Sequence, residues 1–154
     1  MKLKLTELAH LAEIVAAIAV VVSLIYVGRE VQGNTAAIRA SALQSVSQRS
    51  SEALQTLAYD SVMSRIREVG NADPSLLSAR EAYRFREWNR GYWLTMQNVY
   101  FQHQLGVFEA DVWQGYNRIV CAGIAQAGLR ATWEDHRNAL STTFVEVVES
   151  CPDF

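Results

Sequence analysis

The chain has 154 residues, a formal net charge of −2 and two cysteines. This length allows one small domain with its own core, and the near-neutral charge excludes the strongly basic surface that attracts nucleic acids. Half of the residues are apolar and 19% are charged, whereas about a quarter are charged in ordinary soluble domains. The composition predicts a membrane segment joined to a small folded domain, with no nucleic-acid partner.

The first element is an uncharged run from Ile14 to Gly28, IVAAIAVVVSLIYVG, which Glu13 and Arg29 enclose. In a helix this run covers about 22 Å, whereas the hydrocarbon core of a bilayer is roughly 30 Å thick. A helix that starts at Leu8 is long enough to cross the bilayer. We therefore expect one N-terminal transmembrane helix that anchors the chain in the lipid bilayer.

Residues 1–33 are assigned to the N-terminal segment and anchor, and residues 34–154 to an α-helical soluble domain. A cleaved secretory signal is the main alternative, since Lys2 and Lys4 give the chain a basic start. Charged side chains interrupt the approach to the apolar run, however, and no small-x-small cleavage triplet directly follows Ser23. These features favour a retained anchor.

Three polar side chains recur at every third position just before the run: Glu7, His10 and Glu13. They lie on one side of the expected helix, mostly across from apolar residues, so the segment suits the headgroup region of a membrane. In a homo-oligomer the same side chains would instead ring the mouth of a cation-conducting pore. Interface placement is favoured because only Glu13 reaches the hydrocarbon boundary.

Small side chains form a strip along the anchor helix, at spacings of three and four residues: Ala9, Ala12, Ala16, Ala19 and Ser23. Large side chains occupy the opposite face, at Leu11, Ile14, Ile18, Val21, Val22 and Ile25. A strip of this kind lets two helices approach closely in lipid, where packing drives association. The same spacing continues past the membrane through Gly33 and Ala40. We therefore predict a homo-oligomer whose interface includes Ala12, Ala16, Ala19 and Ser23; the alternative is that alanine is simply common in such anchors.

Beyond the anchor the apolar spacing is helical throughout, and no stretch alternates as a strand does. The first helix covers residues 35–57 and either prolongs the anchor helix or restarts at Gly33-Asn34-Thr35. The others are expected near residues 61–70, 79–104, 112–127, 133–140 and 142–149. The predicted fold class is all-α, with a single N-terminal transmembrane helix followed by a small helical bundle.

Local signals set the expected helix ends. Four residues are expected N-caps: Asp60, Asp111, Thr132 and Ser141. Ser78 with Glu81 matches a capping box, and Gly70 is expected to close the helix that Asp60 opens. The segment from Asn71 to Pro74 reads as a turn. The helix from residue 79 should face inward through Phe85, Trp88, Tyr92, Met96 and Val99.

Candidate residues for chemistry are sparse. His103 and His136 could join Glu109 or Asp135 as metal ligands, but a structural or surface role is the favoured interpretation. We therefore assign no catalytic residue, no metal site and no cofactor. An aromatic set could line a pocket near His103 and Glu109, although core packing is favoured. Its members are Tyr92, Trp93, Tyr100, Phe101, Phe108, Trp113 and Tyr116.

Two further sets of residues have competing interpretations. The arginines at positions 80, 84, 86 and 90 could touch anionic lipid, but a solvated face with ion pairs to Glu81 and Glu87 is favoured. Cys121 and Cys151 could form one disulfide outside the cell or stay reduced inside it, and two ordinary thiols are favoured. Cys121 lies among apolar residues and reads as a small buried side chain, while Cys151 reads as incidental.

The run LAEIVAAIAVVVSLIYVGREVQGNTAAIRASA (Leu11 to Ala42) resembles the start of a broad group of uncharacterised bacterial single-span membrane proteins. The segment YFQHQLGVFEADVWQGY (Tyr100 to Tyr116), followed by Trp133-Glu-Asp-His-Arg137, is similar to the downstream pattern of that group. The resemblance implies an α-helical protein of the bacterial inner membrane with a soluble bundle, and brings no agreed activity or cofactor.

Orientation in the membrane is nearly balanced by charge, because Lys2 and Lys4 precede the span while Arg29 and Arg39 follow it. In the group that the chain resembles, basic residues usually follow the span, which implies a cytoplasmic bundle. Lys2 and Lys4 depart from that pattern.

Together these features predict a membrane-anchored, self-associating helical scaffold, sensor or accessory subunit without catalytic activity, with other membrane proteins as candidate partners. A homo-oligomeric ion-conducting pore with Glu7, His10 and Glu13 at its mouth is the alternative. An enzyme with an aromatic pocket near His103 and Glu109 is the least favoured function.

Overall fold

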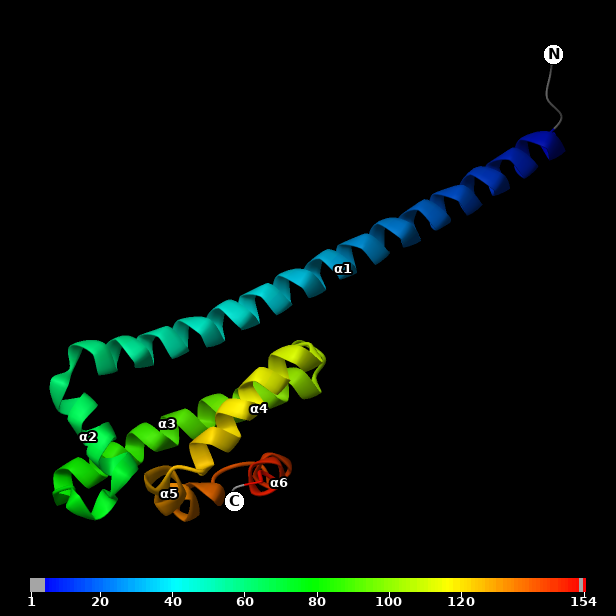
Figure 1. The fold of residues 1–154 in the computed structure, drawn as a ribbon. Helices are drawn as coiled ribbons and strands as arrows, with labels where there is room; N and C mark the ends of the chain where they lie inside the picture. Colours follow the sequence, from blue (N-terminus) through cyan, green and yellow to red (C-terminus); the bar gives the residue numbers. More distant parts are fainter. Residues whose placement is uncertain (1–4, 153) are drawn as a thin grey trace. The chain divides into compact units, whose positions relative to one another are not determined.

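The computed structural model describes residues 5–152 and 154, with side chains described from residue 8 onward. In that part of the chain all regular structure is helical and no strand occurs, which confirms the all-α prediction (Figure 1). The elements are α1 (Leu5–Tyr59), α2 (Ser61–Ala72), the short 3-10 helix η1 (Pro74–Leu76), α3 (Ala79–Gln104), α4 (Ala110–Ile124), α5 (Ala127–Arg137) and α6 (Thr142–Glu149). The chain divides into two compact units, residues 1–41 and residues 42–154.

The first unit consists of α1 up to Ser41. The helix passes through Gly33-Asn34-Thr35 without a break, so of the two expected alternatives the continuous helix occurs and the restart does not. Inside the helix the Thr35 hydroxyl donates a hydrogen bond to the carbonyl of Val31, at 2.9 Å. This bond to the preceding turn gives a polar side chain a partner without ending the helix.

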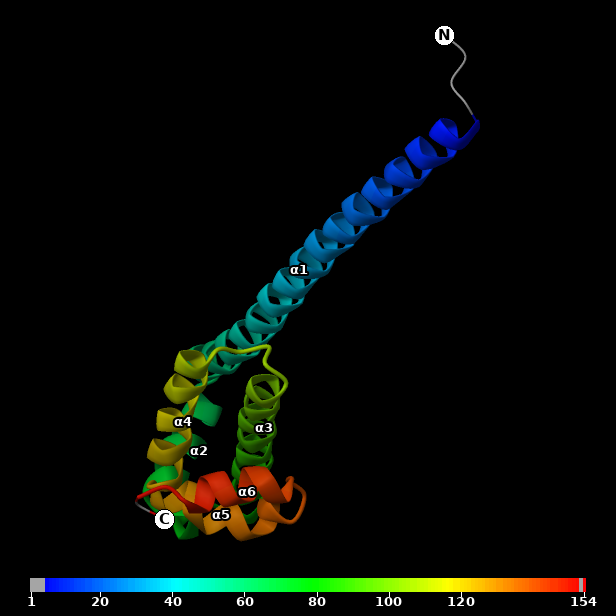
Figure 2. The same ribbon diagram turned by 90° about the vertical axis from the view of Figure 1, so that its right-hand side faces the viewer.

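The second unit is built on α3 and α4, which lie side by side and are crossed by α5 and α6 (Figure 2). The four helices share the main core cluster, whose largest members are fully buried. Among them, the rings of Trp93 on α3 and Trp133 on α5 meet edge to face, with centroids 4.8 Å apart. Each large side chain buried in this way contributes about 1.5–3 kcal/mol to the stability of the bundle.

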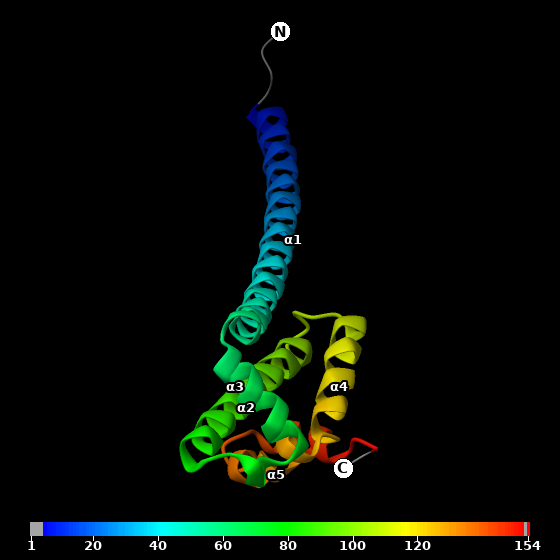
Figure 3. The same ribbon diagram turned by 60° about the vertical axis from the view of Figure 1, so that its left-hand side comes forward.

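Two smaller clusters bring α2 and the end of α1 onto this framework. Met63 and Ile66 of α2 pack with Phe85 of α3, and Figure 3 shows the ribbons of α2 and α3 beside each other. On α1, Val46 is buried against Val99 of α3 and Phe108 of the loop that follows it. These contacts use one face of the segment 42–59 of α1, and the remaining faces of that segment stay exposed.

Gly70 permits close packing and does not end α2, which continues to Ala72. A Cβ atom at Gly70 would lie 2.7 Å from Cδ2 of Phe85, closer than real contacts allow. On α5, a Cβ atom at Gly128 would collide with the carbonyl oxygen of Gly70. The predicted role of Gly70 as a helix terminator is therefore wrong. A glycine is required at this position because the aromatic ring of Phe85 occupies the space that a Cβ atom would take.

Three of the predicted helix starts are confirmed. The carboxylate of Asp60 accepts a hydrogen bond from the amide of Met63 at 2.9 Å, and the hydroxyl of Ser141 accepts one from the amide of Phe144 at 3.3 Å. At the start of α3 the Glu81 carboxylate accepts bonds from both the amide and the hydroxyl of Ser78, at 3.0 and 2.7 Å.

Two of the predicted caps are wrong. Asp111 lies in the first turn of α4, whose N-cap is Glu109. Thr132 lies inside α5, which begins at Ala127 rather than at Trp133. Its buried hydroxyl accepts a hydrogen bond from the Asn89 side chain of α3 at 3.1 Å, so it joins two helices instead of starting one.

Candidate functional site

The most prominent functional surface is the apolar stretch of α1. Among the described helices α1 alone is long and apolar enough to cross a membrane, and none of its apolar window is buried within the protein. Leu24 and Tyr26 are 66% and 67% exposed. A core helix of a soluble protein passes the same test of length and composition, but most of its surface would be covered by its own fold.

The small-residue strip is also uncovered. Ala12, Ala16, Ala19 and Ser23 are all exposed in the first unit. The same spacing of three and four residues continues into the second unit, where its positions remain exposed: Gln44, Ser47, Ser51, Leu54 and Ala58. The bundle instead buries Val46, on a different side of the helix. The intramolecular fold therefore makes no use of the strip.

The polar N-terminal face is described in part. The His10 ring and the Glu13 carboxylate lie 3.5 Å apart, and both side chains are more than three-quarters exposed. The side chain of Glu7 lies outside the described residues. Within one chain this face therefore presents an exposed imidazole–carboxylate pair to its surroundings.

Except for Phe101, which is exposed, the aromatic set belongs to the core or packs against it. Trp93, Tyr100 and Phe108 are buried, and Tyr92, Trp113 and Tyr116 pack against the core clusters. Two shallow grooves occur elsewhere, one at the corner between α1 and α2 and one along α2. Neither groove is lined by a histidine.

His103 and Glu109 lie at the turn that joins α3 to α4. The His103 ring stacks on Trp113, with centroids 5.9 Å apart and an interplanar angle of 11°. Its Nδ1 lies 3.2 Å from the carbonyl oxygen of Phe108. Glu109 is exposed at the start of α4. These contacts give His103 a structural role at the turn that joins α3 to α4.

Tyr92 is likewise structural. Its phenol donates a hydrogen bond to the carbonyl of Ile119 at 2.9 Å, which fastens α3 to α4. Burial raises the pKa of Tyr92 to about 12, against an opposing effect of Arg67. The phenol is therefore protonated at neutral pH and serves as a donor, not as a base.

His136 is the buried histidine of the bundle, at 5% exposure on α5. Its Nε2 atom has no hydrogen-bond partner in the described part of the chain. Burial is the main influence on the ring and lowers the pKa of His136, although Asp135 and Glu87 act in the opposite direction. No group of three histidine, cysteine or acidic side chains in the described part could hold a metal ion.

Two of the four arginines singled out on α3 pair with acidic residues. Arg84 lies 3.4 Å from the Asp60 carboxylate, and Arg90 lies 3.7 Å from Glu87. Glu81 pairs with Arg65 of α2. The ion pair expected within α3 forms between Arg90 and Glu87, whereas Arg84 and Glu81 pair with residues of the preceding segment, Asp60 and Arg65.

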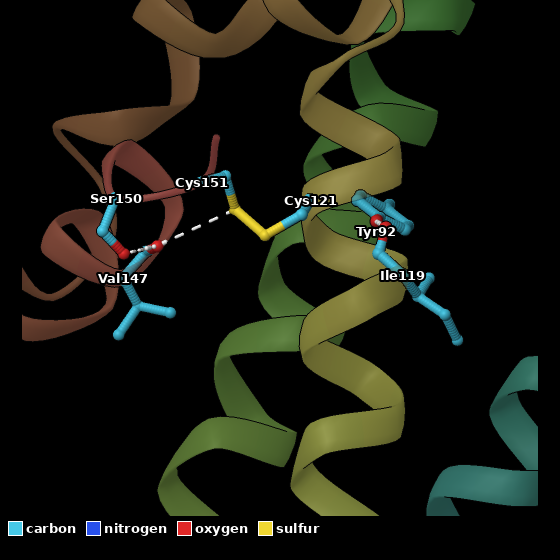
Figure 4. Close-up of a disulfide and its surroundings, with 6 residues drawn as sticks. All are labelled: Tyr92, Ile119, Cys121, Val147, Ser150 and Cys151. Atoms are coloured by element: carbon cyan, nitrogen blue, oxygen red, sulfur yellow. Dashed lines mark hydrogen bonds between the residues drawn. A yellow bond between two sulfur atoms is a disulfide. The ribbon is translucent and has the colours of Figure 1, made fainter. Parts of the chain in front are cut away.

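A disulfide joins Cys121 of α4 to Cys151, which follows α6 (Figure 4). The prediction of two ordinary thiols is therefore wrong, and Cys151 is not incidental. The two Cα atoms are 5.3 Å apart, a separation that lets the side chains reach each other without displacing the backbone. The apolar neighbours of Cys121 are the core against which the C-terminal helix is held.

Comparison of the chain with protein-family models, curated proteins and solved structures found no match. The candidate function therefore depends on the chain's own surfaces: the exposed apolar stretch of α1, its uncovered strip and the disulfide-linked bundle.

Proposed function

We propose that the chain is a single-pass protein of a bacterial inner membrane that self-associates through α1 and carries a helical bundle as scaffold, sensor or accessory subunit. The observation that carries the proposal is the apolar stretch of α1, of which nothing is buried by the rest of the chain. Lipid is the environment in which such a surface is stable, since roughly 25 cal/mol is gained per Å² of apolar surface removed from water.

Self-association is supported by the uncovered strip. Small side chains let two copies of α1 come into close backbone contact in lipid. The three-four spacing is that of a left-handed coiled coil, and it continues along the exposed side of α1 as far as Ala58. A non-enzymatic role is supported by the structural contacts of His103 and Tyr92.

Alkaline carbonate extraction, followed by N-terminal sequencing, tests the anchor. A spanning α1 keeps the full-length chain in the membrane pellet, because alkaline carbonate strips peripheral proteins but not a helix inserted in lipid. Recovery of the chain in the supernatant would show that α1 is not an anchor, and a new N-terminus after Ser23 would show that the residues before it are a cleaved signal.

A cation-conducting homo-oligomer is the second candidate, favoured by the exposed pair of His10 and Glu13 at the edge of the span. Symmetric copies of the chain would bring their Glu13 carboxylates together, and an entering cation would relieve the repulsion between these carboxylates. Proteoliposomes containing the purified chain should show no cation flux if the scaffold proposal is correct. A cation current that is abolished in Glu13→Gln, at unchanged oligomer mass, would establish the pore instead.

A further inference from the structure

The disulfide links two segments that are distant in sequence. Cys121 and Cys151 are 30 residues apart, and the bond closes a loop that contains α5 and α6. Cys151 is buried at 6% exposure and belongs to the main core cluster, with Val148 and Phe144 of α6. The bond therefore holds the last helix of the chain against the centre of the bundle.

We propose that Cys121 and Cys151 are a substrate of the cell's thiol-oxidising enzymes, so that the bundle lies on the oxidising side of the membrane and the residues before the span lie in the cytoplasm. Structural disulfides persist in exported compartments, whereas cytosolic thiols are kept reduced. This inference names the orientation and a processing partner of the proposed membrane protein, and rests on its anchor only for the cytoplasmic location of the N-terminal segment.

The reaction requires a partner of defined chemistry. Formation of the bond removes two protons and two electrons from the two thiols. A disulfide in an oxidoreductase accepts the electrons and becomes a dithiol, through a mixed disulfide with one of the two cysteines. The second cysteine then attacks the mixed disulfide and releases the reduced enzyme, which leaves Cys121 and Cys151 joined.

Charge around the span is compatible with this orientation. Lys2 and Lys4 lie on the cytoplasmic side, where lysine and arginine are preferred, and Arg29 and Arg39 lie on the other. The near balance of these charges does not decide the orientation, whereas the disulfide indicates that the bundle lies in an oxidising compartment. This location replaces the cytoplasmic bundle implied by the resemblance to single-span proteins.

The redox state of the native chain is the first test. Cells of a Gram-negative host that express the full chain are quenched with acid, and thiols are then tagged with a maleimide that carries a polymer of known mass. The wild-type chain should gain no mass before reduction and two tags after it. The Cys121→Ser variant should gain one tag without reduction. Two tags on the wild type without prior reduction would overturn the proposal.

Labelling from one side of the membrane is the second test, and does not require the variants to fold. In a Cys121→Ser/Cys151→Ser background, single cysteines are introduced at Thr143, an exposed residue of α6, and at Thr6, before the span. With the outer membrane permeabilised, an impermeant maleimide should label Thr143→Cys directly and Thr6→Cys only after lysis. The reverse pattern, or protection of both sites, would overturn the orientation.

Carbonate extraction of the labelled Thr143→Cys chain separates this inference from the proposed function. Labelled chain in the pellet supports both the anchor and the orientation. Labelled chain in the supernatant supports the oxidised, exported bundle. The same result contradicts the proposed anchor, and with it the cytoplasmic location of residues 1–13.

Discussion

At the scale of single residues, His136 shows how burial turns a polar side chain into a pH-sensitive part of the core. The ring lies on α5 near the charged side chains of Glu87 and Arg90 of α3 and of its neighbour Asp135, and near the backbone of Arg86. Burial outweighs the acidic neighbours and lowers the pKa of His136 below 6.5. The folded bundle therefore favours the neutral ring.

We predict that the bundle loses stability as the pH falls through 6.5 towards the lowered pKa of His136. The unfolded chain takes up a proton there before the folded chain does, so the stability is present above pH 6.5 and declines below it. Urea unfolding can be followed by tryptophan fluorescence, since all four tryptophans lie between residues 88 and 133. A His136→Phe variant should have a shallower decline between pH 7 and pH 5, and parallel curves for the two proteins would contradict this.

Residue chemistry also explains which local predictions succeed. Asp60 and Ser141 cap helices through bonds to amides three residues ahead, so a short window of sequence contains both partners. Thr132 has the same capping chemistry, but its partner is Asn89, 43 residues earlier in the chain. No local pattern identifies that partner. Thr132 therefore reads as an N-cap from the sequence, although α5 begins at Ala127.

At the scale of elements, the single helix α1 contributes residues to both units of the chain. In residues 42–59 Val46 packs on the bundle, and in the first unit the strip from Ala12 onward is exposed. The length of the helix was predictable, because apolar and small residues keep helical spacing from Leu8 to Leu57. The sequence does not decide between a restart and a continuous helix at Gly33, because Gly, Asn and Thr are weak helix formers that a longer helix can still accommodate.

We predict that Ala16→Leu with Ala19→Leu disrupts the oligomer. The added bulk falls where two backbones should touch, and overpacking of this kind costs about 1–3 kcal/mol, equivalent to a loss of about fivefold to a hundredfold in association. Chemical crosslinking in membranes, or native mass in mild detergent, measures the change. Ile18→Leu with Val22→Leu alters the opposite, large-residue face and is the matched control. Equal effects from the two pairs would show that the strip is not the interface.

At the scale of the whole molecule, the disulfide adds a covalent link to a small core. The bundle of about 110 residues has room for a real hydrophobic core, yet α6 has only eight residues. A helix of that length is unstable by itself in water. It is held by the burial of Phe144 and Val148 and by the bond from Cys151 to α4.

We predict that reduction of the disulfide destabilises the bundle by about 3–4 kcal/mol, the loop-closure value for a separation of this size. The urea midpoint of the wild-type bundle should fall on addition of reductant, measured at a fixed pH above 7. The Cys121→Ser/Cys151→Ser variant should begin at the lower midpoint and respond no further. An unchanged wild-type midpoint would show that the bond contributes little to stability.

The pairing of Cys121 with Cys151 could not be predicted from the sequence. Two cysteines 30 residues apart are compatible with a bond or with two thiols, and nothing in the spacing selects between them. The choice depends on α6 folding back across α4, a long-range contact that follows from the burial of Phe144 and Val148. The all-α class, by contrast, followed from apolar spacing that is local to each helix.

The loop closed by this bond also governs what happens when the chain is cut. A protease that cleaves once between residues 121 and 151, for example after Arg130 or Arg137, leaves both fragments in one molecule until a reductant is added. A nicked bundle would keep its full mass on a non-reducing gel and retain its last helix. A single cleavage in the segment that joins α4 to α6 therefore leaves the C-terminal fragment attached in an oxidising compartment. The fragment is lost only where thiols are kept reduced.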